Sequence, residues 1–306
     1  MATATIKSVP EDFRVFEQLD LEFSGVGEHA YFLVEKTGWN TRDVARAIAE
    51  AYAVREMDVG YAGMKDKQAV TQQWFSVVTP ADRWLPDLPG IRCLEHARHT
   101  RKLRRGQHQG NRFELVLRNV CGADAAAFRA LADGFPNAFG SQRLSTDNEA
   151  QARAWIQQRP HRKNKRQRRS QREGWHLSVL RSVLFNKVLA ARCEHAAAHG
   201  QAGPGWLIEG DVAVDGQPTG PLWGRGRSAT QAAALTVEQA ALAEEAGLCE
   251  ALEHSGLDQA RRKLYEIPGA LEVTSPARDQ LLLCFTLPPG AYATTMLAAL
   301  VHLEEQ

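Results

Sequence analysis

The chain has 306 residues, in which 37 lysines and arginines nearly balance 36 aspartates and glutamates, so the formal net charge is +1. This length suggests two domains or one large one, because domains usually hold about 100–200 residues. A charge so close to zero argues against a uniformly basic nucleic-acid binder, although basic segments can still be segregated along the chain. No apolar run approaches the about 18 residues of a membrane span, and the N-terminus lacks the apolar core of a signal peptide.

The five cysteines are odd in number and widely scattered, with no CxxC and no Cys/His cluster: Cys93, Cys121, Cys193, Cys249 and Cys284. This usage predicts a reducing cytoplasm and no structural zinc. The sequence contains neither GxxxxGK[ST] nor a GxGxxG after a strand. Phosphate-loop and dinucleotide chemistry are therefore not expected.

The first part of the chain contains predicted strands and helices. Asn40 to Asp43 form a polar cap before apolar residues at helical spacing, which predicts an amphipathic helix over 41–53. Apolar residues alternate with polar ones in 112–120, as in a strand with one buried face. Composition predicts further strands at 30–36 and 71–79 and a helix at 123–134.

The composition changes from about residue 137. Helices are predicted at 148–158, 177–198 and 236–264, the last with glycine breaks at Gly247 and Gly256, and the Gly- and Pro-rich stretch 200–227 is expected to be loop with a short strand at 211–215. The apolar run 281–287 predicts a strand buried on both faces, followed by a helix at about 293–303. Strands near both ends and helices between them favour an α/β domain interrupted by a helical domain.

Positive charge is concentrated in two segments without any acid. Residues 98–112 carry six cations and residues 159–172 carry eight, whereas 237–258 holds six acids and no lysine or arginine. Such cationic stretches neutralise phosphates, and arginine forks suit phosphate geometry. Solvated basic loops are the alternative, but two segments beside predicted elements favour nucleic acid.

Residues 63–67, Gly-Met-Lys-Asp-Lys, precede a predicted strand. Composition alone favours a charged surface turn in which Asp66 is one exposed acid. The functional alternative is that the glycine admits a ligand close to the backbone and the flanking cations keep Asp66 ionised as a nucleophile or base.

Short sequence motifs occur on both sides of this turn and along the rest of the chain. They are Val9–Phe13, Asn40–Arg42, Ala62–Lys67, Ala69–Thr71, Arg98-His99, Arg101–Arg104, Gly110–Phe113, Asn137, Phe139-Gly140, Gln142-Arg143, Arg181-Ser182, Leu184–Asn186, Leu287-Pro288 and Gly290–Thr294. In order and spacing the chain resembles the TruD family of tRNA pseudouridine synthases over nearly its whole length. The block around Asp66 is the most specific.

The resemblance implies an α/β (α+β) fold with a pseudouridine synthase-like mixed-sheet catalytic domain, formed by residues 1–137 and 266–306. A mainly helical TRUD domain is expected to be inserted at 138–265. The implied activity is isomerisation of uridine to pseudouridine in tRNA, typically at position 13, by an isomerase that uses no metal and no cofactor. A cytoplasmic monomer with tRNA as its partner and no membrane association is expected.

The family's functional residues match positions of this chain. Asp66 matches the catalytic aspartate, Lys7 the cation beside it, and Phe13 and Phe113 the aromatic rings at the base, while Asn111 can both donate to and accept from the uracil edge. A base must leave its stack to be reached, which calls for such a pocket. Contacts to the RNA backbone are expected from Arg98, Arg101, Lys102, Arg104, Arg105, Arg112 and Arg143.

Each of these assignments has a non-functional alternative. Phe13 and Phe113 can be plain core rings, and Lys7 a solvated lysine. The family's NYFGxQRFG block reads Asn-Ala-Phe-Gly-Ser-Gln-Arg-Leu-Ser at 137–145, which leaves open a tRNA-binding or folding protein that has lost catalysis. An unrelated Asp-dependent RNA hydrolase is a remote third hypothesis, because no second clustered carboxylate or metal motif is present.

Overall fold

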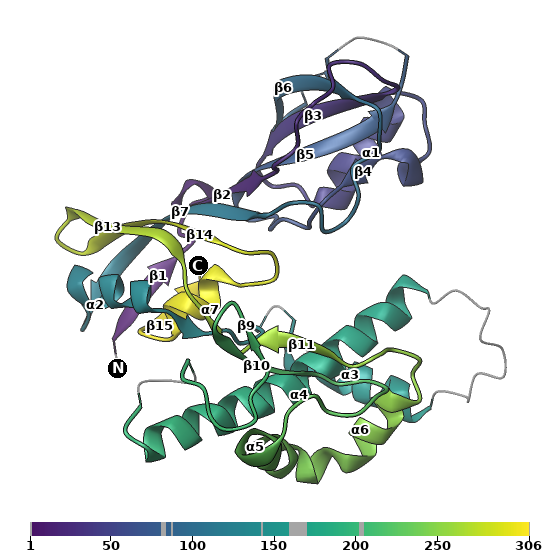
Figure 1. The fold of residues 1–306 in the computed structure, drawn as a ribbon. Coiled ribbons are helices and arrows are strands. Elements are labelled where there is room, and N and C mark those ends of the chain that lie inside the picture. Colours follow the sequence, from purple (N-terminus) through teal and green to yellow (C-terminus); the bar gives the residue numbers. More distant parts are fainter. Residues whose placement is uncertain are drawn as a thin grey trace. The chain divides into compact units, whose positions relative to one another are not determined.

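The computed structural model describes residues 2–80, 84–86, 88–141, 143–158, 170–201 and 205–305. The chain divides into two compact units (Figure 1). Unit 1 comprises Met1–Ala132, Pro268–Ala293 and Leu300–Gln306, and unit 2 comprises Asp133–Ile267 and Thr294–Ala299. Most of the basic segment 159–172, and Gln142 of the sequence motif, lie outside the described residues.

Unit 1 is built on a mixed sheet that contains ten strands in the described part of the chain. Seven strands follow one another in the order β13-β14-β7-β2-β5-β3-β6, while β4 pairs with β5, and β1 pairs with both β7 and β15. The β2–β5 and β1–β15 pairs are parallel and the others antiparallel. The predicted mixed-sheet α/β class is therefore confirmed. The strands are β1 (Thr3–Ile6), β2 (Phe13–Gln18), β3 (His29–Lys36), β4 (Gly60–Tyr61), β5 (Val70–Val78), β6 (Ile91–His99), β7 (Gly110–Cys121), β13 (Gly269–Ala277), β14 (Gln280–Leu287) and β15 (His302–Glu305).

Segments from the two ends of the chain complete this sheet. β14 pairs with β7 from Leu281 opposite Leu117 to Leu287 opposite Asn111. Figure 1 shows the late strands β13 and β14 beside the early strands β7 and β2. The C-terminal segment therefore forms part of the same structural layer as the segment that carries Asn111.

Helix α1 (Thr41–Ala51) covers one face of the sheet. Its apolar residues Val44 and Ile48 belong to one buried cluster with Phe32 of β3 and Phe75 of β5. The short helix α2 (Ala125–Arg129) begins after Asp124, whose side chain accepts a hydrogen bond from the Ala127 N–H. Single 3-10 turns lie at Pro10–Asp12, Glu56–Asp58 and Ala130–Asp133.

Unit 2 is organised around the long helix α4 (Gln171–Ala198), which contacts α3 (Thr146–Gln157), α5 (Ala232–Leu242) and strand β10 (Gln217–Leu222). Ser170 caps α4 in a capping box with Glu173. The remaining elements are α6 (Ala246–Glu253), the 3-10 turn Ala243–Glu245, and strands β8 (Phe135–Pro136), β9 (Ala213–Val214), β11 (Ala260–Lys263) and β12 (Tyr265–Glu266), while α7 (Ala293–Ala298) begins at the end of a unit 1 segment.

Two predictions for unit 2 were wrong. The stretch 236–264 is not all helical, because α6 ends at Glu253 and Ala260–Lys263 is strand β11. Part of the expected loop 200–227 is strand β10, which pairs with β11. Tertiary packing requires glycine at position 220 of this strand, since a Cβ there would lie 2.7 Å from the Leu264 side chain. The short strand expected at 211–215 is present as β9.

Two predictions for the C-terminal segment were also wrong. Strand β14 alternates between buried residues such as Leu283 and half-buried residues such as Cys284, so only one of its faces is fully buried. The last helix ends at Ala298, and His302–Glu305 forms β15 instead, because this segment pairs with β1.

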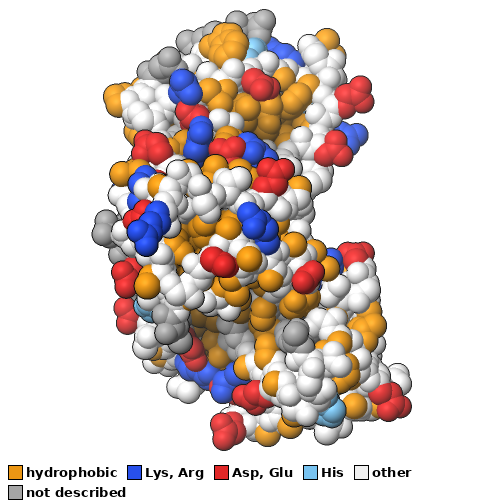
Figure 2. Space-filling view, turned by 90° about the vertical axis from the view of Figure 1, so that its left-hand side faces the viewer, with side chains coloured by type: hydrophobic (Ala, Val, Ile, Leu, Met, Phe, Trp, Pro, Cys, Tyr) orange, Lys and Arg blue, Asp and Glu red, His pale blue; other side chains and the backbone are white. Residues whose placement is uncertain are grey.

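The surface mixes charges of both signs. On the face drawn in Figure 2, lysine and arginine side chains alternate with aspartate and glutamate side chains rather than forming one continuous patch. Among the described residues, no helix has the length and apolar character required to cross a membrane.

Candidate active site

Asp66 lies in the loop that leads from β4 into β5. Its Oδ2 accepts a hydrogen bond from Lys7 Nζ at 2.7 Å, and its Oδ1 accepts one from the Gln68 backbone N–H at 3.0 Å. The Asp66 side chain is 23% exposed, whereas that of Lys7 is 3% exposed. The carboxylate is thus held from within the protein and remains accessible from outside.

Lys7 follows directly after β1 and adopts a left-handed backbone conformation with a φ of 59°. This conformation costs an L-residue other than glycine about 1–2 kcal/mol. Strained residues of this kind occur preferentially at functional sites, where the surrounding structure holds them. The buried ion pair with Asp66 accompanies this conformation, so the solvated-lysine alternative does not describe Lys7.

The two predicted aromatic residues connect to this ion pair through ring contacts. Lys7 Nζ lies 5.0 Å from the centroid of the Phe13 ring. The Phe13 and Phe113 rings meet edge to face with centroids 6.2 Å apart, and Phe113 stacks on Phe285 at 5.2 Å. Both predicted rings are buried, so they have core packing as well as proximity to the candidate catalytic pair.

Asn111 stands two residues before Phe113 on β7, so their side chains lie on the same face of the sheet. The Asn111 Oδ1 atom is buried and has no hydrogen-bond partner among the described residues. Because a buried polar atom without a partner is costly, this oxygen is a candidate acceptor for a ligand.

Lys36 is a residue of the site that sequence reasoning missed. It is the last residue of β3, is fully buried, and donates from Nζ to the backbone carbonyl of Asp66 at 2.6 Å. Burial lowers the pKa of Lys36 to about 8, although the charge of Asp66 opposes this effect. Lys36 thus holds the backbone of the Asp66 loop from the side opposite to solvent.

A second set of buried contacts fixes the start of the same loop. Thr41, the first residue of α1, accepts a hydrogen bond from the Lys65 N–H and donates to Gln73 Oε1, both at 2.9 Å. Gln73 in turn donates to the Gly63 carbonyl at 3.2 Å. The loop is therefore held at Gly63, Lys65 and Asp66 by side chains from α1, β3 and β5.

Lys65 and Glu17 form a buried ion pair next to this loop. Lys65 Nζ donates to Glu17 Oε2 at 2.7 Å, with both side chains almost fully buried. The other Glu17 oxygen accepts from the Trp74 N–H at 3.1 Å. Glu17 occupies a buried position of β2, in the alternating pattern that also buries Phe13 and Val15. Sequence reasoning missed Glu17, although an acid at such a position of an alternating strand is a signal that could have indicated this site.

His108 borders the same pair. Burial lowers its pKa, the charge of Lys65 acts in the same direction, and Glu17 opposes both. These effects favour the neutral form of the ring, and its buried Nδ1 has no partner in the described part of the chain.

The basic connection, residues 100–109 between β6 and β7, packs against the segment that leads to Asp66. The Gly106 N–H donates to the Ala62 carbonyl and the Leu103 N–H donates to Ser76 Oγ, both at 2.9 Å. The Arg105 guanidinium lies 3.8 Å from the centroid of the Tyr61 ring. Local contacts thus hold this cationic segment beside the loop of the candidate catalytic residue.

The predicted RNA-contacting cations occupy several different environments. Arg101 and Arg104 are exposed on the basic connection, and Lys102 donates to the Met57 carbonyl. Arg98 donates to the Thr79 carbonyl at 2.8 Å. Arg112 pairs with Glu114 at 2.7 Å, and Arg143 belongs to unit 2.

Comparisons with known proteins identify the family. The family model described as "tRNA pseudouridine synthase D (TruD)" matches residues 2–149. The chain is 41% identical to tRNA pseudouridine synthase D of Methylococcus capsulatus, across 98% of this chain and 92% of that protein. It belongs to the tRNA pseudouridine synthase D family. The protein of the same name from Cellvibrio japonicus is 39% identical, across 100% of this chain and 91% of the relative.

A solved structure shares the fold of this family member. The TruD crystal structure from Methanosarcina mazei aligns with a TM-score of 0.68 at 19% sequence identity, and covers 98% of this chain and 93% of the other. At this identity the likeness concerns the fold, and the full-length relatives at about 40% identity carry the family assignment.

Proposed function

We propose that this protein isomerises a uridine of tRNA to pseudouridine, with Asp66 as the catalytic residue. The observation that carries the proposal is the partly exposed Asp66 carboxylate, paired with the buried Lys7 and held on its backbone side by Lys36. An isomerase of this kind needs an ionised carboxylate at a fixed position, and a cation at 2.7 Å favours the ionised form. The named relatives supply the reaction and the substrate.

In this proposal the reaction breaks the N-glycosidic bond of uridine, turns the uracil within the site and rejoins it to the ribose through carbon 5. The hydrogen of carbon 5 then leaves as a proton, and N1, no longer bonded to the ribose, gains a proton. Asp66 acts either as a nucleophile or as a base at the sugar. Phe13 and Phe113 supply the apolar wall for the flipped base, and Asn111 exchanges hydrogen bonds with its edge. The composition of the uridine is unchanged, so the reaction is a net isomerisation that requires no redox partner.

The finer parts of the proposal concern the target and its binding. We place the target at tRNA position 13, and assign contacts with the RNA backbone to the predicted cations of segment 98–112 and to Arg143. Residues 138–265 act as an inserted domain that binds tRNA, and residues 1–137 and 266–306 carry the chemistry. The protein acts as a cytoplasmic monomer without a metal or cofactor.

Mapping pseudouridine in cellular tRNA tests this function. In tRNA from cells that lack the protein, we expect pseudouridine to disappear at position 13 and to remain elsewhere. A plasmid with the wild-type gene should restore it, whereas a plasmid carrying Asp66→Asn should not. An unchanged map in the deleted strain would refute the proposal, and restoration by Asp66→Asn would refute the role of Asp66.

A tRNA-binding protein without catalysis is the alternative. Only the altered block at 137–145 supported it, and that block lies outside the loop of Asp66. The intact contacts of Asp66, Lys7 and Lys36 favour the enzyme. Purified protein that binds tRNA but forms no pseudouridine in it would favour the alternative.

A further inference from the structure

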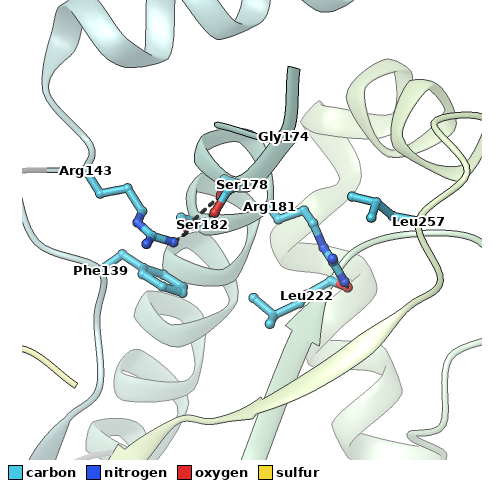
Figure 3. Close-up of a pocket in the computed structure, with 8 residues that line it drawn as sticks. All are labelled: Phe139, Arg143, Gly174, Ser178, Arg181, Ser182, Leu222 and Leu257. Atoms are coloured by element: carbon cyan, nitrogen blue, oxygen red, sulfur yellow. Dashed lines mark hydrogen bonds between the residues drawn. The ribbon is translucent and has the colours of Figure 1, made fainter. Parts of the chain in front are cut away.

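Unit 2 contains a pocket of about 200 Å³ beside helix α4. Figure 3 shows Arg143 and Phe139 on one side of Ser178, and Arg181, Leu222 and Leu257 on the other. Pockets for drug-sized ligands usually enclose about 300–1,000 Å³, so this pocket suits a smaller group. Its volume fits a phosphate or part of one nucleotide.

The pocket is positively charged. Two arginines and no acid line it. Arg181 donates to the carbonyl oxygens of Leu222 and Asp258, which holds its guanidinium in place. The nearby Asp258 carboxylate pairs with Arg225 at 2.7 Å. The lining charge therefore favours an anionic ligand.

Arg143 is positioned between a hydroxyl and two aromatic rings. One Nη atom donates to Ser178 Oγ at 2.9 Å. The guanidinium carbon lies 5.1 Å from the Phe139 ring centroid and 5.7 Å from that of Trp175. Because a guanidinium has five N–H donors in a planar fork, Arg143 can hold Ser178 and a phosphate together.

Phe139, which lines the pocket, is held rigidly, whereas Trp175 is not part of the lining but lies beside Arg143. Asn186 binds both the N–H and the carbonyl of Phe139 at 2.9 Å, and the Arg262 guanidinium lies 4.2 Å from the Phe139 ring centroid. Trp175, in contrast, is 42% exposed. An exposed tryptophan beside an arginine is the arrangement that single-stranded RNA uses for base stacking and phosphate contact.

We infer that this pocket binds one nucleotide of the tRNA away from the reacting uridine, with its phosphate on Arg143 and its base on Trp175. The inference rests on the proposed function for the choice of tRNA as the ligand. Arg181 contributes charge to the same pocket, and Ser178 orients Arg143. The pocket therefore contributes to substrate binding and takes no part in the chemical step.

Salt-dependent binding of unmodified tRNA to the full-length protein tests this inference. Each phosphate contact contributes about 0.7–0.9 to the slope of log Kd against log salt concentration. We expect Arg143→Ala to lower this slope by about that amount and to weaken binding several-fold at 0.1 M salt. Arg143→Lys should keep most of the slope because it keeps the charge. If the alanine variant does not fold, Arg143→Gln, which also removes the charge, is measured in its place and should lose the same slope.

Arg227→Ala is the matched control, because it removes an exposed cation of the same unit. We expect this variant to bind tRNA with the wild-type slope. Trp175→Ala should weaken tRNA binding without changing the slope, since it removes stacking and no charge. A slope for Arg143→Ala equal to that of Arg227→Ala would overturn the inference.

The source of the phosphate and the reaction are tested separately. If uridine monophosphate binds the pocket of wild type but not of Arg143→Ala, while the tRNA slope stays unchanged, the pocket serves a free nucleotide and the inference for RNA is wrong. With pseudouridine formation as readout, Arg143→Ala should raise KM and leave kcat within about two-fold. Wild-type protein that forms no pseudouridine but shows the Arg143-dependent slope would refute only the proposed function.

Discussion

The Lys7 ammonium donates to Asp66 Oδ2 at 2.7 Å, although 59 residues separate the two in the chain. The Lys7 side chain is 3% exposed and its backbone φ is 59°. A buried cation in an unfavourable backbone conformation persists only where other interactions hold it. Replacing Lys7 should therefore show most clearly what controls the protonation state of the Asp66 carboxylate.

Replacing Lys7 with methionine should shift the pH dependence of turnover. A cation beside a carboxylate favours its ionised form, so removal of the Lys7 ammonium favours the protonated form of Asp66. The acidic limb of the profile of kcat/KM against pH should therefore move to higher pH. Lys7→Arg, which keeps the charge, is the control, and an acidic limb that stays in place in Lys7→Met would contradict the assigned role.

Lys36 should make stability depend on pH in the alkaline range. Its pKa is about 8 in the folded protein against 10.5 ordinarily. Between these values the unfolded chain binds a proton that the folded protein does not, so stability rises with pH across this window, by about 3 kcal/mol in total. Urea unfolding from pH 7.5 to 10.5 should show the wild type gaining this amount relative to Lys36→Met, and a constant difference would show that Lys36 does not titrate there.

The buried pair of Glu17 and Lys65 should be costly to break. Glu17→Gln retains the shape and the acceptor for the Trp74 N–H, but leaves the Lys65 charge without its partner. Loss of one member of such a pair destabilises by about 3–5 kcal/mol. Asp258→Asn is the matched control, because its pair with Arg225 is exposed and such pairs contribute at most about 1 kcal/mol.

The double variant Glu17→Met with Lys65→Met separates charge from packing. It should recover most of the stability lost in Glu17→Gln, because no buried charge then lacks a partner. Equal destabilisation in Glu17→Gln and Asp258→Asn in urea unfolding would contradict the account of the buried pair.

Phe113 should affect both stability and turnover, and Phe285 only stability. The two rings stack at 5.2 Å and are both buried, but Phe113 also meets Phe13, the ring beside Lys7. Each Phe→Leu variant should lose a similar amount of stability in thermal unfolding. Phe113→Leu should in addition lower kcat/KM about ten-fold, since stacking contributes about 1–3 kcal/mol per base. An equal decrease of kcat/KM in both variants would show that Phe113 acts only as a ring of the hydrophobic core.

The sequence predicted the elements whose pattern is local. The helix predicted at 41–53 and the alternating strand predicted at 112–120 match α1 and β7 closely, although the Asn40 side chain makes no capping hydrogen bond. Strands β11 and β15 were missed, because they form through pairing with distant segments, β10 and β1. Their own residues carry little strand pattern, and tertiary pairing decides their conformation.

The residues of the candidate site likewise fall into those that the sequence predicts and those that only the fold brings together. Asp66 lies in a motif that is recognisable in the sequence. The resemblance of the chain to the TruD family also predicted Lys7 and Phe13 as site residues. Lys36 and Glu17 carry no motif. They belong to the site only because strands β3 and β2 place them under the Asp66 loop, and burial of a charged side chain is decided by the fold.

The most direct test of the catalytic role of Asp66 is single-turnover pseudouridine formation at position 13 of unmodified tRNA, with purified wild type and Asp66→Asn. The amide keeps the size of the carboxylate but cannot act as a nucleophile or base. Asp20→Asn, at an exposed position of the same unit, is the control and should retain wild-type rates. We predict that Asp66→Asn binds tRNA with a Kd within about three-fold of wild type and forms no detectable pseudouridine. Pseudouridine formation by Asp66→Asn at the wild-type rate would contradict the central claim.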